Sequence, residues 1–241
     1  MSPAPTPFIF VADDVALDFA NTLAALPAAC RLGAARLVCW VHELDGVADR
    51  LLDATQRREL LPQVSHFVAA GERVATMLTD RWHVAEERVT AVDPFTPPSR
   101  PVAVAPGSTG RPRPTILGSG SLVPRKGPDA FVAVLAALAA HHELPPAAWV
   151  GGEPDSPFGA QLRTDIAAAG LADRVQLVAG VPTLDPWWPA PGLLLHTPRE
   201  DPFPLVVIEA AQRGIPVVTW DSGGAADLLR RAGTPELVAA L

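Results

Sequence analysis

The stretch that decides the fold is HTPREDPFPLVVIEAAQRGIPVV, residues His196 to Val218. An apolar segment over residues 192–196 leads into it, and the pattern predicts a strand there. A helix is expected over residues 205–213, ended by Gly214, and a second apolar strand over residues 215–219. A strand, a loop, a helix and a strand in succession are typical of a parallel sheet.

The loop before this helix is acidic and rich in proline. Pro202 and Pro204 leave the first N–H groups of the helix, around Leu205, facing the loop, and such groups attract anions, phosphate above all. Glu209 lies on the second turn in an otherwise apolar run, where a carboxylate is costly to bury unless something partners it. A solvated helix edge and a ligand-binding carboxylate are both open interpretations of Glu209.

Asp201 and Glu209 are eight residues apart, and the residues between them include Phe203, Pro204 and Leu205. This segment resembles the E-x7-E segment of retaining, nucleotide-sugar-dependent glycosyltransferases of the family 4 type, which belong to the glycosyl transferases group 1 and have the GT-B fold. The family has Glu at the first position. Asp201 has the right spacing and takes this role here, with Glu200 directly before it in reserve.

The resemblance implies an α/β protein of the GT-B type, with two Rossmann-like parallel-sheet domains of which the N-terminal one is incomplete. By the same resemblance, Glu209 would hold the ribose hydroxyls of a nucleotide sugar. Asp201 and the amides near Phe203, Pro204 and Leu205 would hold the sugar.

A second segment, GSGSLVPRKG over residues 118–127, follows a predicted strand and opens a predicted helix. It is neither a dinucleotide fingerprint, because the third Gly is absent, nor a Walker loop, because Lys126 precedes its Gly. It resembles the family's strand, Gly-turn and Lys-Gly segment, which implies that Gly118 and Lys126 lie at the donor diphosphate. Arg125 would assist, because Ser121 stands where the family has an arginine. An ordinary solvated turn is the alternative.

The first 93 residues predict a partial α/β unit. RLVCWVH, residues 36–42, has the near-continuous apolar character of a buried parallel strand, and it ends in His42 and Glu43. A polar pair at a strand end is one interpretation; the resemblance instead implies that His42 contacts the donor sugar from the opposite domain. We expect one polar-faced helix over residues 47–60 and another over residues 72–79.

The domain boundary is predicted from composition. Seven prolines fall between residues 94 and 114, which predicts a linker over residues 94–113. It would join an acceptor-side domain over residues 1–93 to a nucleotide-sugar-binding domain over residues 114–241. Strands and helices alternate regularly in the second, which is typical of a doubly wound sheet with ligands at the carboxyl ends of its strands.

Composition and charge exclude several classes of protein. The net charge of −7 argues against nucleic acid as the main partner. No apolar run is long enough to span a bilayer, and no signal peptide is recognisable. Cys30 and Cys39 fit buried thiols in a reduced, cytoplasmic setting. No metal-binding motif is present, so we expect neither a metal nor a cofactor beyond the donor itself.

The resemblance implies transfer of a sugar, with retention at the anomeric carbon and without metal, from a nucleotide-diphosphate sugar to an unknown glycan, lipid or small-molecule acceptor. The alternative is a non-catalytic nucleotide-sugar-binding module or a truncated pseudoenzyme, because the family's first strand and Gly-rich loop are not found before residues 8–11. Apolar surface exposed there would favour an oligomer, and a peripheral membrane contact is also open.

Overall fold

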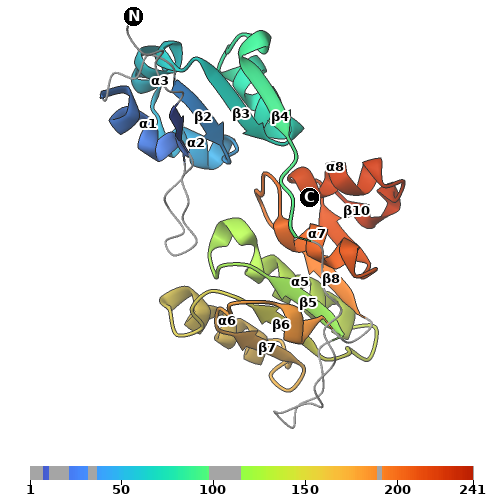
Figure 1. The fold of residues 1–241 in the computed structure, drawn as a ribbon. Coiled ribbons are helices and arrows are strands. Elements are labelled where there is room, and N and C mark those ends of the chain that lie inside the picture. The colour runs from blue at the N-terminus through green and yellow to red at the C-terminus, as the bar shows by residue number, and fades with distance from the viewer. Residues whose placement is uncertain (1–7, 11–21, 32–36, 98–114, 189–191, 241) are drawn as a thin grey trace, which may run out of the picture. The chain divides into compact units, whose positions relative to one another are not determined.

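The computed structural model describes residues 8–10, 22–31, 37–97, 115–188 and 192–240, and it confirms an α/β fold built on parallel sheets (Figure 1). The chain divides into two compact units. One comprises Met1–Pro94 with Asp201–Phe203, and the other comprises Phe95–Glu200 with Pro204–Leu241. The predicted linker falls largely on residues 98–114, which lie outside the described part.

The N-terminal unit has a four-stranded parallel sheet in the order β1-β2-β3-β4. Its strands are β1 (Phe8–Phe10), β2 (Leu37–Val41), β3 (His66–Ala70) and β4 (Val89–Val92). Its helices are α1 (Thr22–Arg31), α2 (Asp45–Leu51), α3 (Ala54–Leu60) and α4 (Glu72–Thr76), with short turns η1 (Leu61–Gln63), η2 (Met77–Arg81) and η3 (Glu86–Arg88). Because the strands follow one another in space as in sequence, right-handed crossovers place the helices on one face.

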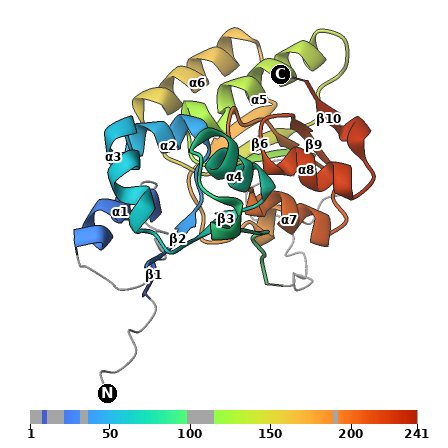
Figure 2. The same ribbon diagram turned by 90° about the horizontal axis from the view of Figure 1, so that it is seen from above.

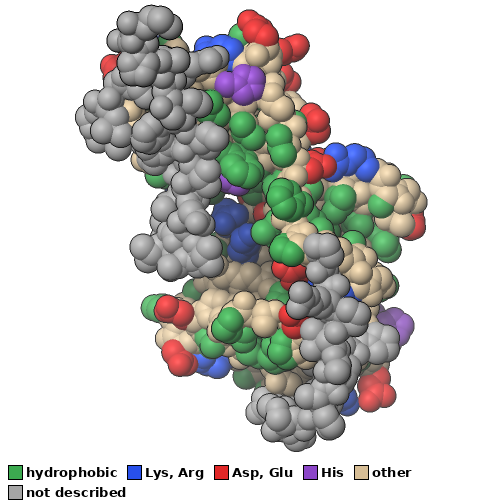
Figure 3. All heavy atoms as spheres, in the orientation of Figure 1, with side chains coloured by type: hydrophobic (Ala, Val, Ile, Leu, Met, Phe, Trp, Pro, Cys, Tyr) green, Lys and Arg blue, Asp and Glu red, His purple; other side chains and the backbone are tan. Residues whose placement is uncertain are grey.

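Side chains on this sheet alternate between the helix-covered face and the opposite face. Leu37, Cys39 and Val41 of β2 pack with Phe67 and Ala69 of β3 in a buried cluster with the helices. The intervening residues of both strands are half-buried, and Figure 3 shows hydrophobic side chains at the surface over β3 and β4. The sheet therefore has one core face and one weakly covered face within the described part.

The prediction of a single helix over residues 47–60 is wrong, because the helix is interrupted at Asp53. The Asp53 carboxylate accepts hydrogen bonds from the amides of Thr55 (2.8 Å) and Gln56 (2.9 Å), and the Gln56 side chain accepts one from the Asp53 amide. This capping box starts α3 as a separate helix. The helix expected over residues 72–79 also differs, since α4 passes at Met77 into the π-helical turn η2.

The C-terminal unit has a six-stranded parallel sheet in the order β10-β9-β8-β5-β6-β7. Its strands are β5 (Ile116–Ser119), β6 (Ala147–Val150), β7 (Val175–Val178), β8 (Leu193–His196), β9 (Val217–Trp220) and β10 (Val238–Ala239). Its helices are α5 (Pro128–Ala139), α6 (Pro157–Ala168), α7 (Leu205–Gln212) and α8 (Gly224–Arg231), with the turns η4 (Pro124–Lys126), η5 (Asp185–Trp187) and η6 (Pro235–Leu237).

Helices cover both faces of this sheet because the chain winds outward from β5 in two directions. Figure 2 shows α5 and α6 side by side; they pack on Ile116 and Trp149. The helices α7 and α8 pack on the alternate residues Leu117, Ala148 and Leu194. Right-handed crossovers running in opposite directions from β5 place α5 and α6 on one face and α7 and α8 on the other, so this unit is doubly wound as predicted.

Candidate functional site

The strand order of the C-terminal unit reverses at β5. Going forward from β5, the chain adds β6 and β7 on one side, and then returns to add β8, β9 and β10 on the other. In open parallel sheets, ligands bind in the crevice at the carboxyl ends of the strands where this reversal occurs. Here the reversal falls between the loop after β5 and the loop after β8, which contain the two segments singled out in the sequence.

These two loops are bonded to each other along their length. The Arg199 amide donates to the Arg125 carbonyl oxygen at 2.9 Å, and Arg125 Nη1 donates to the Glu200 carbonyl oxygen at 3.1 Å. The Arg199 guanidinium also donates hydrogen bonds to both carboxylate oxygens of Asp129, at 2.8 and 2.6 Å. Its hydrogen bond lowers the pKa of the Asp129 carboxyl despite partial burial. The structure thus brings the Arg125 side chain to the backbone of Glu200.

Gly127 allows the closest approach between the loops. Its φ of +68° is left-handed, and a Cβ atom added there would meet the Thr197 carbonyl oxygen. Thr197 Oγ1 donates to the Gly127 carbonyl oxygen at 2.9 Å. Since only glycine combines this conformation with this proximity, the Lys-Gly pair of the sequence has a structural basis at its second residue.

Lys126 is half-buried and lies along the turn that follows β5. A Cβ atom on Gly120 would be 3.4 Å from Lys126 Cγ, so the lysine stem runs over the bare backbone of Gly120. That backbone is fixed by β6, because Gly120 donates to the Val150 carbonyl at 3.1 Å and accepts from Trp149 Nε1 at 2.9 Å. The single lysine of the chain is therefore held over a rigid turn.

Gly118 has a packing role that the sequence did not indicate. It is buried in β5, and a Cβ atom there would lie 2.5 Å from the Trp149 ring and 2.9 Å from the Phe131 ring. These two rings meet edge to face with centroids 5.5 Å apart. The absence of a side chain at Gly118 is explained by this aromatic pair, and its contact with a donor stays a prediction.

The start of α7 is open toward the loop after β8. Pro204 is the N-cap residue and forms no side-chain cap; Leu205, the first residue of the helix, is 45% exposed. Uncapped amides at a helix start carry the positive end of its dipole. In the preceding loop Asp201 is buried and Phe203 half-buried.

Glu209 is half-buried rather than freely solvated. Burial raises the pKa of its carboxyl and nearby Asp185 raises it further, while Arg213 lowers it. Arg213 Nη1 donates to the Glu209 carbonyl oxygen at 3.0 Å, and its Nη2 pairs with Asp185 at 2.5 Å. The Arg213 guanidinium also lies over the Trp188 ring, 5.4 Å from its centroid.

Trp188 packs in the core of the C-terminal unit. Its indole N–H is near enough to Glu209 to favour the carboxylate, yet Nε1 has no hydrogen-bond partner in the described part of the chain. The carboxyl group of Glu209 thus lies in a site that penalises its charge.

Comparison with known proteins gives this arrangement a family. Residues 106–240 match the family Glycosyl transferases group 1. The chain belongs to this family. The predicted membership of the glycosyl transferases group 1 is thereby confirmed, and the matched residues include both loops described above.

Two relatives match parts of the chain. The D-inositol 3-phosphate glycosyltransferase of Jonesia denitrificans is 30% identical over 185 residues, which cover 69% of this chain and 43% of the relative. The lipopolysaccharide core biosynthesis mannosyltransferase LpcC of Rhizobium leguminosarum bv. viciae is 33% identical over 138 residues, covering 55% of this chain and 39% of the relative. The chain spans less than half the length of each.

Solved structures share the fold. HepE of Anabaena, crystallised with UDP, matches 86% of this chain and 59% of its own with a TM-score of 0.68 and 21% identity. Sucrose-phosphate synthase from Thermosynechococcus elongatus matches 90% of this chain and 64% of its own with a TM-score of 0.69 and 20% identity. At these identities the likeness shows the fold alone, and it confirms the GT-B-like architecture.

His42 lies in the N-terminal unit, at the carboxyl end of β2. Its ring contacts the Trp40 ring with centroids 4.8 Å apart, and its amide donates to Glu43 Oε2 at 3.1 Å. Burial lowers the pKa of His42, which favours the neutral imidazole. Because Lys126 and Glu209 belong to the other unit, the predicted contact of His42 with a donor sugar stays a prediction.

Several residues that hold these loops together were not predicted from the sequence. Thr197 and Arg199 join the loops, and Ser222 Oγ donates to the Pro198 carbonyl at 2.6 Å from the turn after β9. The only indication of these residues in the sequence was that each one follows a predicted strand. Within the described residues, no three His, Cys, Asp or Glu side chains are grouped so that they could hold a metal ion. Nor does any described helix combine the length and apolarity needed to cross a membrane.

Proposed function

We propose that this chain is a nucleotide-sugar-dependent glycosyltransferase that retains the anomeric configuration and needs no metal. The observation that carries the proposal is that the loops after β5 and β8 are hydrogen-bonded to each other where the strand order reverses. The loop after β5 holds Lys126 over Gly120, and the loop after β8 leads into the uncapped start of α7. Membership of the family supports transferase chemistry, and the UDP in the HepE structure supports a nucleotide-sugar donor.

The charges of the site suit a diphosphate leaving group. In the proposed complex, Lys126 neutralises the diphosphate with help from Arg125, and the free amides around Leu205 add the positive end of a helix dipole. Fixed donors of this kind stabilise the charge that develops as the glycosidic bond breaks. They supply the role that a metal ion has in other sugar transferases, which is why we propose metal-independent transfer.

The carboxylates are assigned to the sugar moieties of the donor. Glu209 accepts hydrogen bonds from the ribose hydroxyls, and Asp201, with Glu200 in reserve, holds the transferred sugar. Hydrogen bonds from a diol favour the ionised carboxylate, so a bound ribose offsets the burial that raises the pKa of Glu209. In this scheme His42, as a neutral imidazole, donates to the sugar from the N-terminal unit.

The experiment that tests this proposal is calorimetric titration of the chain with UDP, GDP and ADP and with their sugars. We expect one nucleotide to bind, and Lys126→Ala to weaken its binding by roughly 1.5–3 kcal/mol, the range for hydrogen bonds to charged groups. Arg163→Ala removes a positive charge from the exposed side of α6 in the same unit and should leave the affinity unchanged. Failure of the folded chain to bind any nucleotide would overturn the proposal.

A second candidate function is a donor-binding module without transfer activity. It is favoured by one observation, namely that Lys126 and Glu209, the groups proposed to hold the diphosphate and the ribose, both lie in the C-terminal unit. Transfer of the sugar to any acceptor, detected by mass spectrometry, would exclude this candidate. Donor binding without transfer or hydrolysis would establish it. The acceptor in the active case is proposed as a glycan, lipid or small molecule.

A further inference from the structure

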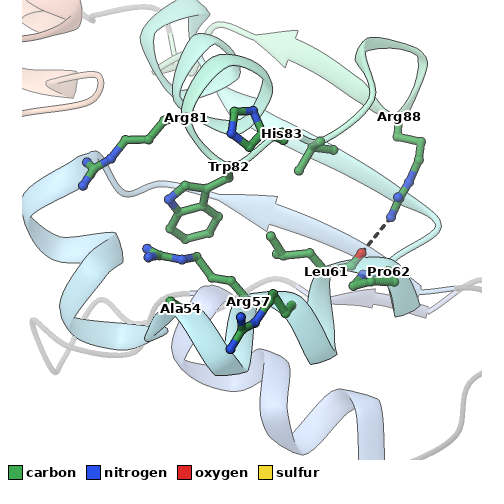
Figure 4. Close-up of a pocket in the computed structure, with 10 residues that line it drawn as sticks. Ala54, Arg57, Leu61, Pro62, Arg81, Trp82, His83 and Arg88 are labelled. Atoms are coloured by element: carbon green, nitrogen blue, oxygen red, sulfur yellow. Dashed lines mark hydrogen bonds between the residues drawn. The ribbon is translucent and has the colours of Figure 1, made fainter.

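A pocket that includes none of the proposed donor-site residues lies in the N-terminal unit (Figure 4). It has a volume of about 310 Å³, and its walls come from α3, η1 and the segment from Arg81 to Arg88. Figure 4 shows Arg81 and Arg88 at opposite ends, with Trp82 and Leu61 between them. This volume is at the lower end of the range for small-molecule sites.

The lining is basic and contains no acid. Its charged residues are the four arginines Arg57, Arg58, Arg81 and Arg88, with His83 beside them and neither Asp nor Glu on the wall. Glu86 and Glu87 precede Arg88 in sequence, but both are exposed and neither lines the pocket. The chain as a whole has a net charge of −7, so a pocket lined by four guanidinium groups has the opposite charge to the rest of the protein.

Some of these arginines form ion pairs within the protein, and others have N–H groups left to bind a ligand. Arg57 pairs with Asp49 at 2.5 Å and lies over the Trp82 ring, and Arg81 is also paired with Asp49. Arg88 donates to backbone carbonyl groups through one nitrogen, Nη2. Arg58 is exposed and makes one hydrogen bond, to Thr55 at 3.3 Å. Arg58 and Arg88 therefore have donor capacity left within the described part of the chain.

The backbone at the rim is unusual in two ways. The helix that follows β3 ends in the π-helical turn η2, and such turns are frequent at functional sites. His83 then takes a left-handed φ of +55° and is the only non-glycine residue in the described part of the chain with positive φ. Glycine is the usual residue at such a helix end, so this position carries an exposed imidazole at some conformational cost.

Trp82 provides a third observation. It is more than nine-tenths buried, and its Nε1 has no hydrogen-bond partner in the described part of the chain. Figure 4 shows this nitrogen on the ring edge toward Arg57 and Arg81. An unpaired buried N–H costs free energy, and an acceptor atom on the body of a bound ligand would recover it.

The pocket is separate from the proposed chemistry of this unit. It lies where η1 leads into β3 and η3 leads into β4, at the amino ends of those strands. His42 follows the carboxyl end of β2, and the strands are parallel. A ligand in the pocket would therefore occupy the opposite edge of the sheet from His42.

We propose that this pocket binds a phosphate group whose attached body packs on Trp82 and Leu61. Guanidinium forks match phosphate oxygens in geometry and charge, and the lining residues Arg58, Arg88 and His83 supply the donors. The phosphate belongs either to a soluble phosphorylated compound or to the headgroup of an anionic lipid. Its chemistry is the same in both cases.

The test uses the full chain carrying Lys126→Ala, so that the proposed donor site does not contribute. Inorganic phosphate and pyrophosphate are titrated by calorimetry, and vesicles of phosphatidylglycerol and of phosphatidylcholine are tested by co-sedimentation. Binding of pyrophosphate indicates a soluble phosphorylated ligand, whereas binding to phosphatidylglycerol vesicles alone indicates a lipid headgroup.

Arg58→Gln is the test variant and Arg50→Gln its control, since both remove an exposed arginine charge from this unit but only Arg58 lines the pocket. We expect Arg58→Gln to weaken binding at least roughly threefold, because a charged contact is lost, and Arg50→Gln to leave it unchanged. His83→Gly, which relaxes the backbone while removing the ring, should weaken binding with the circular dichroism spectrum intact. Equal affinities of the Arg58 and Arg50 variants, or no binding of any probe, would overturn the proposal.

Discussion

The Thr197 carbonyl oxygen lies 1.8 Å from the position that a Cβ atom on Gly127 would take. The loop after β5 and the loop after β8 therefore meet backbone to backbone, and the meeting point directly follows Lys126. A change at this contact should disturb both the stability of the C-terminal unit and the position of its lysine.

Gly127→Ala should lower the free energy of unfolding by roughly 2–5 kcal/mol, because left-handed strain and overpacking add. Gly170→Ala is the matched control, since Gly170 also has a positive φ, +71°, but no atom lies within 4 Å of its added Cβ. Its cost should be about 1 kcal/mol. Urea denaturation measures both, and equal losses would contradict the clash with Thr197.

Glu209→Gln should weaken binding of nucleoside diphosphates and leave binding of inorganic pyrophosphate unchanged. The physical reason is that the proposed contact is with the ribose, which pyrophosphate lacks. Calorimetry with both ligands on wild type and variant is the measurement. An equal loss for both ligands would move Glu209 from the ribose to the phosphates.

The same substitution should change the pH dependence of stability. Burial raises the pKa of Glu209 above its usual 4.5, so the folded chain binds this proton more tightly than the unfolded chain. The resulting stabilisation is fully present below pH 4.5 and is lost as pH rises through the folded-state pKa. The glutamine of the variant cannot ionise. The free energy of unfolding of the variant, measured by denaturation, should therefore rise relative to that of wild type from pH 4.5 to neutrality. A constant difference would contradict the raised pKa.

Arg199 and Asp129 should be energetically coupled. Both side chains are partly exposed, so solvent screening limits the coupling, but the two-pronged geometry favours the upper end of the surface range, about 0.5–1 kcal/mol. A double-mutant cycle with Arg199→Ala and Asp129→Ala measures it. Because the pKa of Asp129 is lowered from 3.8, the coupling should persist above that pH and fade as pH falls through the lower folded-state pKa.

The control for this cycle is the pair Arg163 and Asp155, which is 3.3 Å apart with the Asp155 side chain fully exposed. Its coupling should be close to zero. If the two cycles gave the same energy, the link between the loop after β8 and the start of α5 would not depend on this ion pair.

The sequence predicted best where structure is local. The strands and helices of the C-terminal half follow from apolar runs and from glycines that end helices, and the loop before α7 was recognised from its acids and prolines. The break at Asp53 was also local, and the signal that would have predicted it was Gln56 three residues after a capping residue.

Contacts between distant residues could not be predicted in this way. Arg199 and Asp129 are 70 residues apart in the chain, and nothing near either one indicates the other. Gly118 looked like part of a phosphate-binding turn, but the atoms that exclude a side chain there belong to Trp149 and Phe131. The basic pocket is similarly assembled from residues spread between Ala54 and Arg88, which carry no motif.

The central place of β5 has a consequence for biosynthesis. On the ribosome, β5 is made before β6 and β7 and can pair with them early, but its other neighbour is β8, which begins only at Leu193. Until then one edge of β5, with the apolar residues Ile116 and Leu117, has no partner strand. Unpaired apolar edges are sites of aggregation during folding. A nascent chain stalled before Leu193 is therefore the species of this protein that most needs a chaperone.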